Sequence, residues 1–277
     1  MAINDWREVN RANWDERVEV HLKADDLRLL RAGRGMLNAI EESELGSVAG
    51  LRVLHLQCHF GKDTLALAQR GAEVVGLDFS SAAIGAAQQL TEELGLVSRA
   101  RFVHADLYDA PEAIREPGAF DIVYITWGTI CWLPDITRWA EIVAHFLRPG
   151  GALYFAEGHP AALVLDDETP CADGRPGFFA PYFQSEALIL DDHRDYADPN
   201  ARLRNTRTHQ FMHPLGQVVT ALLSAGLTLE FLHEHASVPW RMFSCLIDDG
   251  CCGYHWPDKP WLPLSYSLRA RRPLSSE

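Results

Sequence analysis

The sequence has no apolar run long enough to cross a bilayer, because its longest hydrophobic stretches are short and carry charges at their ends. Residues 1–8 lack the apolar segment of a signal peptide. Cysteine is scarce as well, since six in 277 residues are too few for a disulfide scaffold. We therefore expect a cytoplasmic protein with reduced thiols and no membrane partner.

Basic side chains are also in deficit: 25 Lys and Arg against 38 Asp and Glu give a net charge of −13. Such a surface repels phosphate backbones, so nucleic acid is not expected as the main partner. The spacings C-x-x-C and H-E-x-x-H are missing, and the adjacent pairs Cys58-His59 and Cys251-Cys252 are poorly placed to share one ion. No metal is expected, and the oligomeric state stays unknown.

What the sequence does contain is an alternation of strand and helix patterns after residue 50. Helical patterns at 62–71, 80–94 and 135–147 separate short apolar runs. Alternation of this kind predicts an α/β fold: a Rossmann-like, doubly wound, mostly parallel sheet covered on both faces. The predicted strands cover residues 51–56, 73–78, 101–105, 120–125 and 152–156.

The remaining segments predict a cap and an insertion around this sheet. Residues 4–46 look helical and amphipathic, whereas 159–212 are rich in Pro, Asp, His and aromatic residues and lack periodicity. A connection far beyond about 12–15 residues usually forms a lid or a substrate-binding insertion. Trp6, Asn10, Trp14, Arg17 and His21 share one face of the first helix. The chain is expected to be one domain with an N-terminal helical cap (1–46), a cofactor-binding core (51–157), an insertion after strand five (158–212) and the end of the sheet (213–277).

The residues that follow each predicted strand form the candidate site, because open parallel sheets bind ligands at the carboxyl ends of their strands. Asp78 ends strand two about 20 residues beyond a glycine-containing loop, where nucleotide binders of this topology hold a ribose. The same acid would serve NAD, so Asp78 alone does not choose the cofactor. The other strand-end segments are 57–61, 106–107 and 126–127.

Together these segments resemble the class I S-adenosylmethionine-dependent methyltransferases over roughly residues 51–157. In that family the first strand ends in an acidic-x-Gly-x-Gly-x-Gly loop. Residues 55–61 read HLQCHFG and keep only the last glycine, which looks like a variant subgroup of small-molecule methyltransferases. The strand at 120–124 and the turn at 147–151 are also typical of the family. The resemblance implies a sheet with an antiparallel last strand, and S-adenosylmethionine as the cofactor.

The resemblance also implies roles for individual residues. Asp78 would accept hydrogen bonds from the ribose hydroxyls, and Asp106 from the adenine amino group. In the family an N-terminal helix often closes over the cofactor, and the ring of Trp14 beside the sulfonium would contribute about 0.5–2 kcal/mol. Helix capping by the two acids, a solvated turn for His59 and a core position for Trp14 are the alternatives. The predicted cofactor-binding residues are Trp14, Gln57, Cys58, His59, Gly61, Asp78, Phe79, Asp106, Leu107, Thr126 and Trp127.

Methyl transfer from a sulfonium is an in-line displacement, so the enzyme must align the acceptor and exclude water. A base is needed only if the nucleophile must lose a proton. His159 and His213 are the predicted catalytic residues, with loop histidines that bond to the backbone as the alternative. Trp127, Trp132 and Phe183 would form an apolar wall for an aromatic acceptor.

The sequence thus predicts methyl transfer to a small molecule, without naming the acceptor or the atom that is methylated. An NAD-dependent oxidoreductase is the first alternative, disfavoured because G-x-G-x-x-G is absent after strand one. A non-catalytic cofactor-binding module is the second. In such a module the insertion would fill the acceptor pocket.

Overall fold

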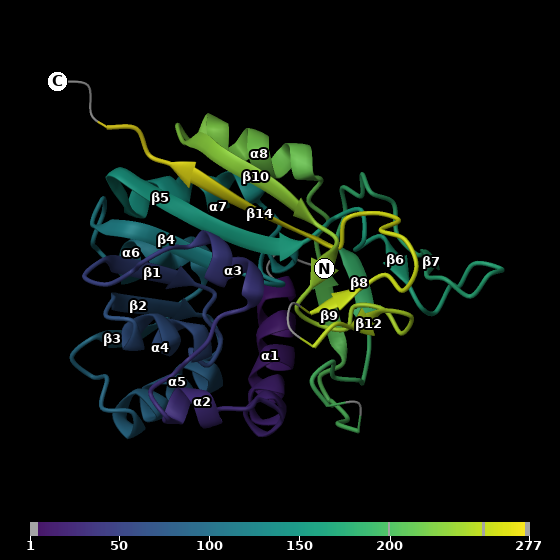
Figure 1. The fold of residues 1–277 in the computed structure, drawn as a ribbon, viewed down its shortest axis with the longest axis horizontal. Helices are drawn as coiled ribbons and strands as arrows, with labels where there is room; N and C mark the ends of the chain where they lie inside the picture. The colour runs from purple at the N-terminus through teal and green to yellow at the C-terminus, as the bar shows by residue number, and fades with distance from the viewer. Residues whose placement is uncertain (1–4, 199, 251–252, 275–277) are drawn as a thin grey trace.

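A seven-stranded sheet with the order β10-β14-β5-β4-β1-β2-β3 forms the centre of the computed structural model, which describes residues 5–198, 200–250 and 253–274 (Figure 1). Cys251 and Cys252 lie outside the described residues. Neighbouring strands run parallel except for β14, which is antiparallel to both β5 and β10. The predicted fold class is confirmed. The strands are β1 (Arg52–Leu56), β2 (Glu73–Asp78), β3 (Ala100–His104), β4 (Phe120–Thr126), β5 (Leu147–Gly158), β10 (Thr228–His235) and β14 (Ser265–Arg271).

Both faces of the sheet are buried, because successive side chains of a strand point to opposite faces. In β1, Leu54 and Leu56 pack with helices α7 and α8, whereas Val53 packs with α4 and α5. Ser80 begins α5 as its N-cap, with its hydroxyl accepting from the backbone N–H of Ala83 at 3.1 Å. The helices are α4 (Lys62–Gln69), α5 (Ser81–Glu93), α6 (Ala110–Ala113), α7 (Ile136–Phe146) and α8 (Leu215–Ser224).

The strand order reverses beside β1, and this reversal places the site. From β1 the chain moves outward to β2 and β3, and then returns to β4 on the other side of β1. Loops that leave neighbouring strands in opposite directions open a crevice at the carboxyl ends. Because helices cover both faces, this edge of the sheet is where a ligand can reach the strand ends.

The N-terminal cap is helical in three pieces rather than one. Helices α1 (Asp5–Ala24), α2 (Arg28–Arg31) and α3 (Ala39–Glu44) are separated by irregular segments. Gly35 lies in the second break, where a Cβ would be 2.8 Å from that of Ala66, so the chain can pass close to α4 only without a side chain. In Figure 1, α1 runs across the carboxyl edge of the sheet. Within the described residues no helix is long and apolar enough to cross a membrane.

The insertion contains short strands where the sequence showed no periodicity, since two to four residues are too few for a pattern to emerge. The Asn10 side chain in α1 donates to the carbonyl of His209 at 2.9 Å and accepts from its N–H at 2.8 Å. Helix and insertion therefore meet over the strand ends. The short strands are β6 (Leu165–Asp166), β7 (Gly177–Phe178), β8 (Leu188–Asp191) and β9 (Arg207–Gln210), followed by β11 (Ser237–Val238), β12 (Ile247–Asp248) and β13 (Tyr254–His255).

Candidate functional site

A cavity of about 480 Å³ lies at the carboxyl edge of the sheet, within the range of about 300–1,000 Å³ typical of small-molecule sites. The loops after β1 to β4 form its floor, α1 contributes Trp6, Trp14 and His21, and the insertion contributes Tyr196. The structure brings all the predicted cofactor-binding residues to this one cavity, from Trp14 through the segments 57–61, 78–79 and 106–107 to Trp127. That they bind a cofactor stays a prediction.

The loop after β1 keeps a glycine-like backbone although two of its glycines are replaced. Gln57 has φ 57° and His59 has φ 50°, at positions where the resembling family carries glycine. This left-handed conformation costs a side-chain-bearing residue roughly 1–2 kcal/mol. At Gly61, with φ 78°, a Cβ would lie 2.6 Å from the ring of Phe102. The loop therefore tolerates side chains at the first two positions but requires glycine at the third.

Two histidines on this side of the cavity are uncharged at neutral pH. Burial lowers the pKa of His55, which takes the place of the family's acidic residue, to about 3. Its Nδ1 pairs with the hydroxyl of Thr64 at 2.8 Å. Burial, as the main cause, lowers the pKa of His59 to about 3 as well. The end of β1 therefore carries no negative charge.

Asp78 presents a buried carboxylate at the end of β2. One oxygen accepts from the backbone N–H of His59 at 2.8 Å, and the other from that of Ser80 at 2.9 Å. Burial raises the pKa of Asp78 to about 6, because these two hydrogen bonds offset only part of the desolvation. The group is mostly ionised at pH 7, and each oxygen has lone-pair capacity left for a donor on a ligand.

Asp106 combines a structural contact with a place in the cavity wall. Its Oδ1 accepts from the backbone N–H of Tyr108 at 2.9 Å and so caps the short 3-10 helix at 107–109. Arg7 in α1 lies 3.4 Å from the same oxygen. Burial raises the pKa of Asp106 despite these two contacts. Asp106 therefore acts as a helix cap through Oδ1, and its Oδ2 remains available to accept a hydrogen bond from a ligand.

A buried glutamate shapes the loop after β4. Glu157 at the end of β5 accepts from the backbone N–H groups of Gly128 at 2.6 Å and Thr129 at 2.7 Å. Burial raises the pKa of Glu157, while these hydrogen bonds favour its ionised form. The adjoining Trp127 has φ 55° and lines the cavity. The carboxylate therefore holds this tryptophan in a conformation that the chain would otherwise avoid.

Aromatic rings close the wall above this loop. The ring of Trp132 meets that of Trp14 edge to face, with centroids 5.4 Å apart, and both line the cavity together with Trp127. Phe183 does not join them, because it is 82% exposed in the insertion. The predicted apolar wall thus consists of tryptophans from α1 and from the loop after β4.

The structure does not bring His159 and His213 to the cavity, which corrects the predicted catalytic placement. Nε2 of His159 lies 3.0 Å from Oε1 of Glu234, and its Nδ1 accepts from the N–H of Ala161 at 3.1 Å. Nε2 of His213 lies 2.7 Å from the carbonyl of Leu133, beside a separate hollow of about 20 Å³. These are the contacts of structural histidines. A ligand in the large cavity would meet neither ring.

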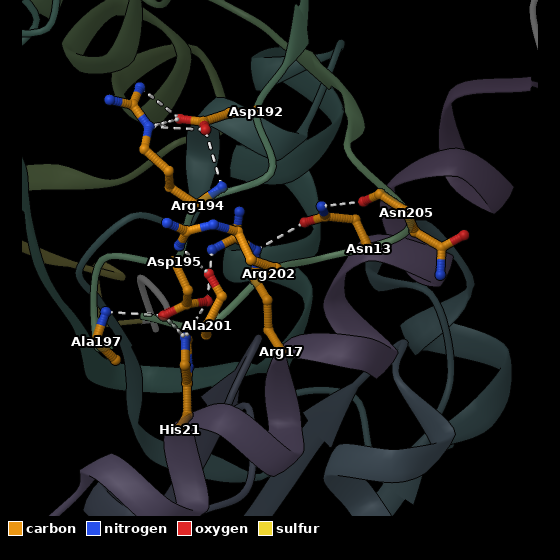
Figure 2. Close-up of polar contacts among 10 residues, drawn as sticks. All are labelled: Asn13, Arg17, His21, Asp192, Arg194, Asp195, Ala197, Ala201, Arg202 and Asn205. Carbon is orange, nitrogen blue, oxygen red and sulfur yellow. Dashed lines mark hydrogen bonds and ion pairs between the residues drawn. The ribbon is translucent and has the colours of Figure 1, made fainter. Parts of the chain in front are cut away.

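The residues of the insertion that complete the site were not predicted from the sequence. The Asp195 side chain is fully buried and accepts from Arg17 and Ala197, while His21 lies beside it (Figure 2). Tyr196 lines the cavity. The sequence around Asp195 and Tyr196 has no periodic pattern. The one sequence feature that indicated such contacts was the polar face of α1, whose side chains need hydrogen-bond partners.

No three His, Cys, Asp or Glu side chains come together as a metal site in the part of the chain that the structure describes. Burial raises the pKa of the Cys58 thiol well above its usual value, which keeps it protonated and a poor metal ligand. The absence of a metal stays a prediction.

Residues 53–151 match a family model described as a methyltransferase domain. A 23S rRNA (uracil(1939)-C(5))-methyltransferase of Nitrosospira multiformis is 40% identical over 77 residues, 27% of this chain and 18% of that protein. A ubiquinone biosynthesis O-methyltransferase of Azoarcus sp. is 32% identical over 109 residues, 39% of this chain and 45% of that protein. The chain thus spans less than half the length of these relatives.

The solved structure of an S-adenosylmethionine-dependent methyltransferase from Mesorhizobium loti superimposes with a TM-score of 0.57 at 22% identity. The match covers 84% of this chain and 96% of that one. At this identity the likeness concerns the fold, and its coverage of 84% of this chain is larger than residues 53–151 alone.

Proposed function

Because residues 53–151 belong to the class I S-adenosylmethionine-dependent methyltransferase family, we propose that the protein transfers a methyl group from S-adenosylmethionine to a small-molecule acceptor. The observation that carries the proposal is the convergence of Asp78, Asp106 and the loop 57–61 on one cavity beneath α1. S-adenosylmethionine supplies the methyl group as a sulfonium, which makes it electrophilic. S-adenosylhomocysteine is then the product.

The residues of the cavity divide among the parts of this cofactor. The ionised carboxylate of Asp78 would accept from the ribose hydroxyls, and such charge-assisted bonds are about twice as strong as neutral ones. Asp106 would accept from the adenine amino group, with the N–H of Leu107 near the ring. The loop 57–61 would hold the methionine part. Trp14 would close over the cofactor from α1.

The tryptophan wall suits a small, flat acceptor. Trp14, Trp127 and Trp132 would position such a molecule and keep water from the methyl group. An RNA acceptor, as in the name of one relative, is less compatible with the net charge of −13. The match to that relative also covers only 18% of its length. Six cysteines suit a reducing compartment, so a cytoplasmic location remains part of the proposal.

The two alternatives differ from this proposal in structural terms. An NAD enzyme needs glycines through which a pyrophosphate can approach the backbone, and side chains of Gln57 and His59 stand at that place. A non-catalytic module would bind the donor without transferring its methyl group, so product analysis separates it from the enzyme.

Calorimetric titration tests the cofactor, and product analysis tests the reaction. We expect S-adenosylmethionine and S-adenosylhomocysteine to bind and NAD to have no measurable affinity. Incubation with methyl-labelled donor and fractions of a metabolite extract should then yield a labelled small molecule. Binding of the donor without any labelled product would favour the non-catalytic module, and binding of NAD alone would favour the oxidoreductase.

Asp106 predicts selectivity for the adenine base. An inosine analogue of S-adenosylhomocysteine places a carbonyl where adenine has its amino group, so two acceptors would face each other. We expect at least about tenfold weaker binding of this analogue, equivalent to about 1.4 kcal/mol. Competition calorimetry with the two ligands measures the ratio. Equal affinities would leave Asp106 with its capping role alone.

A further inference from the structure

An aspartate and a histidine from two distant parts of the chain meet beside the cavity, which His21 lines (Figure 2). Nε2 of His21 in α1 lies 3.1 Å and 3.2 Å from the two carboxylate oxygens of Asp195 in the insertion. Arg17 donates to the same carboxylate at 2.8 Å, and the backbone N–H of Ala197 does so at 2.8 Å. The Asp195 side chain has no exposed surface, and that of His21 is 5% exposed. The pair is thus held rigidly.

The surroundings fix the hydrogen-bonding pattern of this pair. Burial alone would raise the pKa of Asp195, but His21, the N–H of Ala197 and the charge of Arg17 outweigh it and hold that pKa below its usual range. An ionised carboxylate only accepts hydrogen bonds, so Nε2 of His21 must carry a proton. In the neutral ring the lone pair is then on Nδ1, which has no hydrogen-bond partner among the described residues.

The ring orientation is fixed by aromatic neighbours. His59 stacks on His21 with centroids 5.0 Å apart and planes at 14°, and Tyr196 lies 4.9 Å away on the insertion. Of the three histidines that line the cavity, His55 and His59 have pKa values of about 3, too low for either to accept a proton near neutral pH. His21 is therefore the cavity histidine with a nitrogen available as a base.

We propose that His21, positioned by Asp195, is the base that removes the proton of the acceptor nucleophile, and that the acceptor is therefore a protic hydroxyl or amine. This inference rests on the proposed function. The nucleophile attacks the methyl carbon, the carbon–sulfur bond breaks, and sulfur keeps the electron pair. The proton that the nucleophile loses passes to Nδ1 of His21 and then to solvent. Acceptors without such a proton, such as thioethers and tertiary amines, do not need this pair.

His21→Gln tests the base, with Lys23→Gln as the matched control on the solvent-facing side of α1, where the lysine side chain is 74% exposed. The acceptor is the one obtained from the metabolite fractions. We expect His21→Gln to bind S-adenosylhomocysteine within about threefold of the unaltered protein but to lose roughly 10²- to 10⁴-fold in turnover. Lys23→Gln should retain both. Added imidazole should restore turnover to His21→Ala, which keeps the test valid if glutamine perturbs the fold.

Asp195→Asn tests the positioning role through a pH profile. The charged or titratable groups around His21 are Arg17, Asp25, His59, Asp195 and Tyr196. We expect kcat to fall at least about tenfold with KM unchanged, because asparagine can stabilise the wrong tautomer. The acid limb of the profile should shift in this variant and disappear in His21→Gln.

Three outcomes overturn the inference. One is near-normal turnover of His21→Gln, the second is an unchanged acid limb, and the third is a methylated atom that carried no proton in the acceptor. Asp63 also lines the cavity, and burial raises its pKa to about 6. Loss of the acid limb in Asp63→Asn instead would assign the base to that residue. Absence of any labelled product would end the proposed function itself.

Discussion

Replacing Asp78 with alanine is expected to weaken the binding of S-adenosylhomocysteine roughly 10- to 150-fold, or about 1.5–3 kcal/mol, because two hydroxyl donors lose a charged acceptor. The same change leaves the N–H groups of His59 and Ser80 without their acceptor. Asp78→Asn is therefore the milder variant, since its amide oxygen can still accept from one of them. Calorimetry on both variants, after thermal unfolding shows that they are folded, gives the measurement.

The pH dependence of binding separates the carboxylate from a general loss of shape. Because burial raises the pKa of Asp78 to about 6, the ionised form that accepts from the ribose is depleted as pH falls through that value. Ligand hydroxyls favour the ionised form, so affinity should rise with pH up to about 6 and then level off. Asp78→Asn should lack this dependence below pH 7. Equal affinity of the alanine variant and the unaltered protein would refute the ribose assignment.

The fold was predictable because its signals are local. Strand β2 was expected at 73–78 and is found at Glu73–Asp78, since an apolar run that ends in an acid is a complete signal within six residues. Ser80 was recognisable as the N-cap of α5 for the same reason. Strand β5 extends from Leu147 to Gly158, well beyond the expected 152–156, because pairing with β4 and β14 carries the strand past its apolar centre.

The floor of the site was predictable from topology alone. In a parallel sheet the residues after each strand must share one edge, so Asp78, Asp106 and Trp127 had to be neighbours once the strands were known. The part of the site formed by α1 and the insertion was only partly predictable from the sequence. The spacing on α1 showed which face needs partners, but Asp195 sits in a segment without periodicity. Its pairing with His21 across 174 positions depends on how the insertion folds back.

The two histidines predicted to be catalytic, His159 and His213, lie away from the cavity for a related reason. His159 follows β5, at the carboxyl edge of the sheet where the candidate site was expected. In the structure the antiparallel strand β14 occupies that flank, and the ring of His159 packs against Tyr266 with centroids 5.8 Å apart. Strand order thus places a residue at an edge, and the packing of later strands decides whether its side chain reaches the ligand.

Removing residues 1–25 is expected to weaken the binding of S-adenosylhomocysteine by about 100-fold or more, equivalent to about 2.7 kcal/mol. The α1 residues that line the cavity are Trp6, Trp14 and His21, so their loss would expose the cavity to solvent. Water would then compete for Asp78. The insertion would also lose its anchor, because Asn10 and Arg17 bind His209 and Asp195.

The sheet itself should survive this deletion. The buried residues of the two clusters that flank it begin at Leu27, and α1 adds only the partly buried Leu22.

Trp14→Ala tests the contribution of α1 to the site with a single side chain. We expect this variant to lose about 0.5–2 kcal/mol of binding free energy if the Trp14 ring faces the sulfonium of S-adenosylmethionine. The loss should be smaller for S-adenosylhomocysteine, which has no charge on sulfur. Glu19→Gln, on the solvent-facing side of α1 with a side chain 79% exposed, is the matched control and should bind both ligands normally. Normal binding by a folded deletion variant would make α1 a structural support and Trp14 a packing residue.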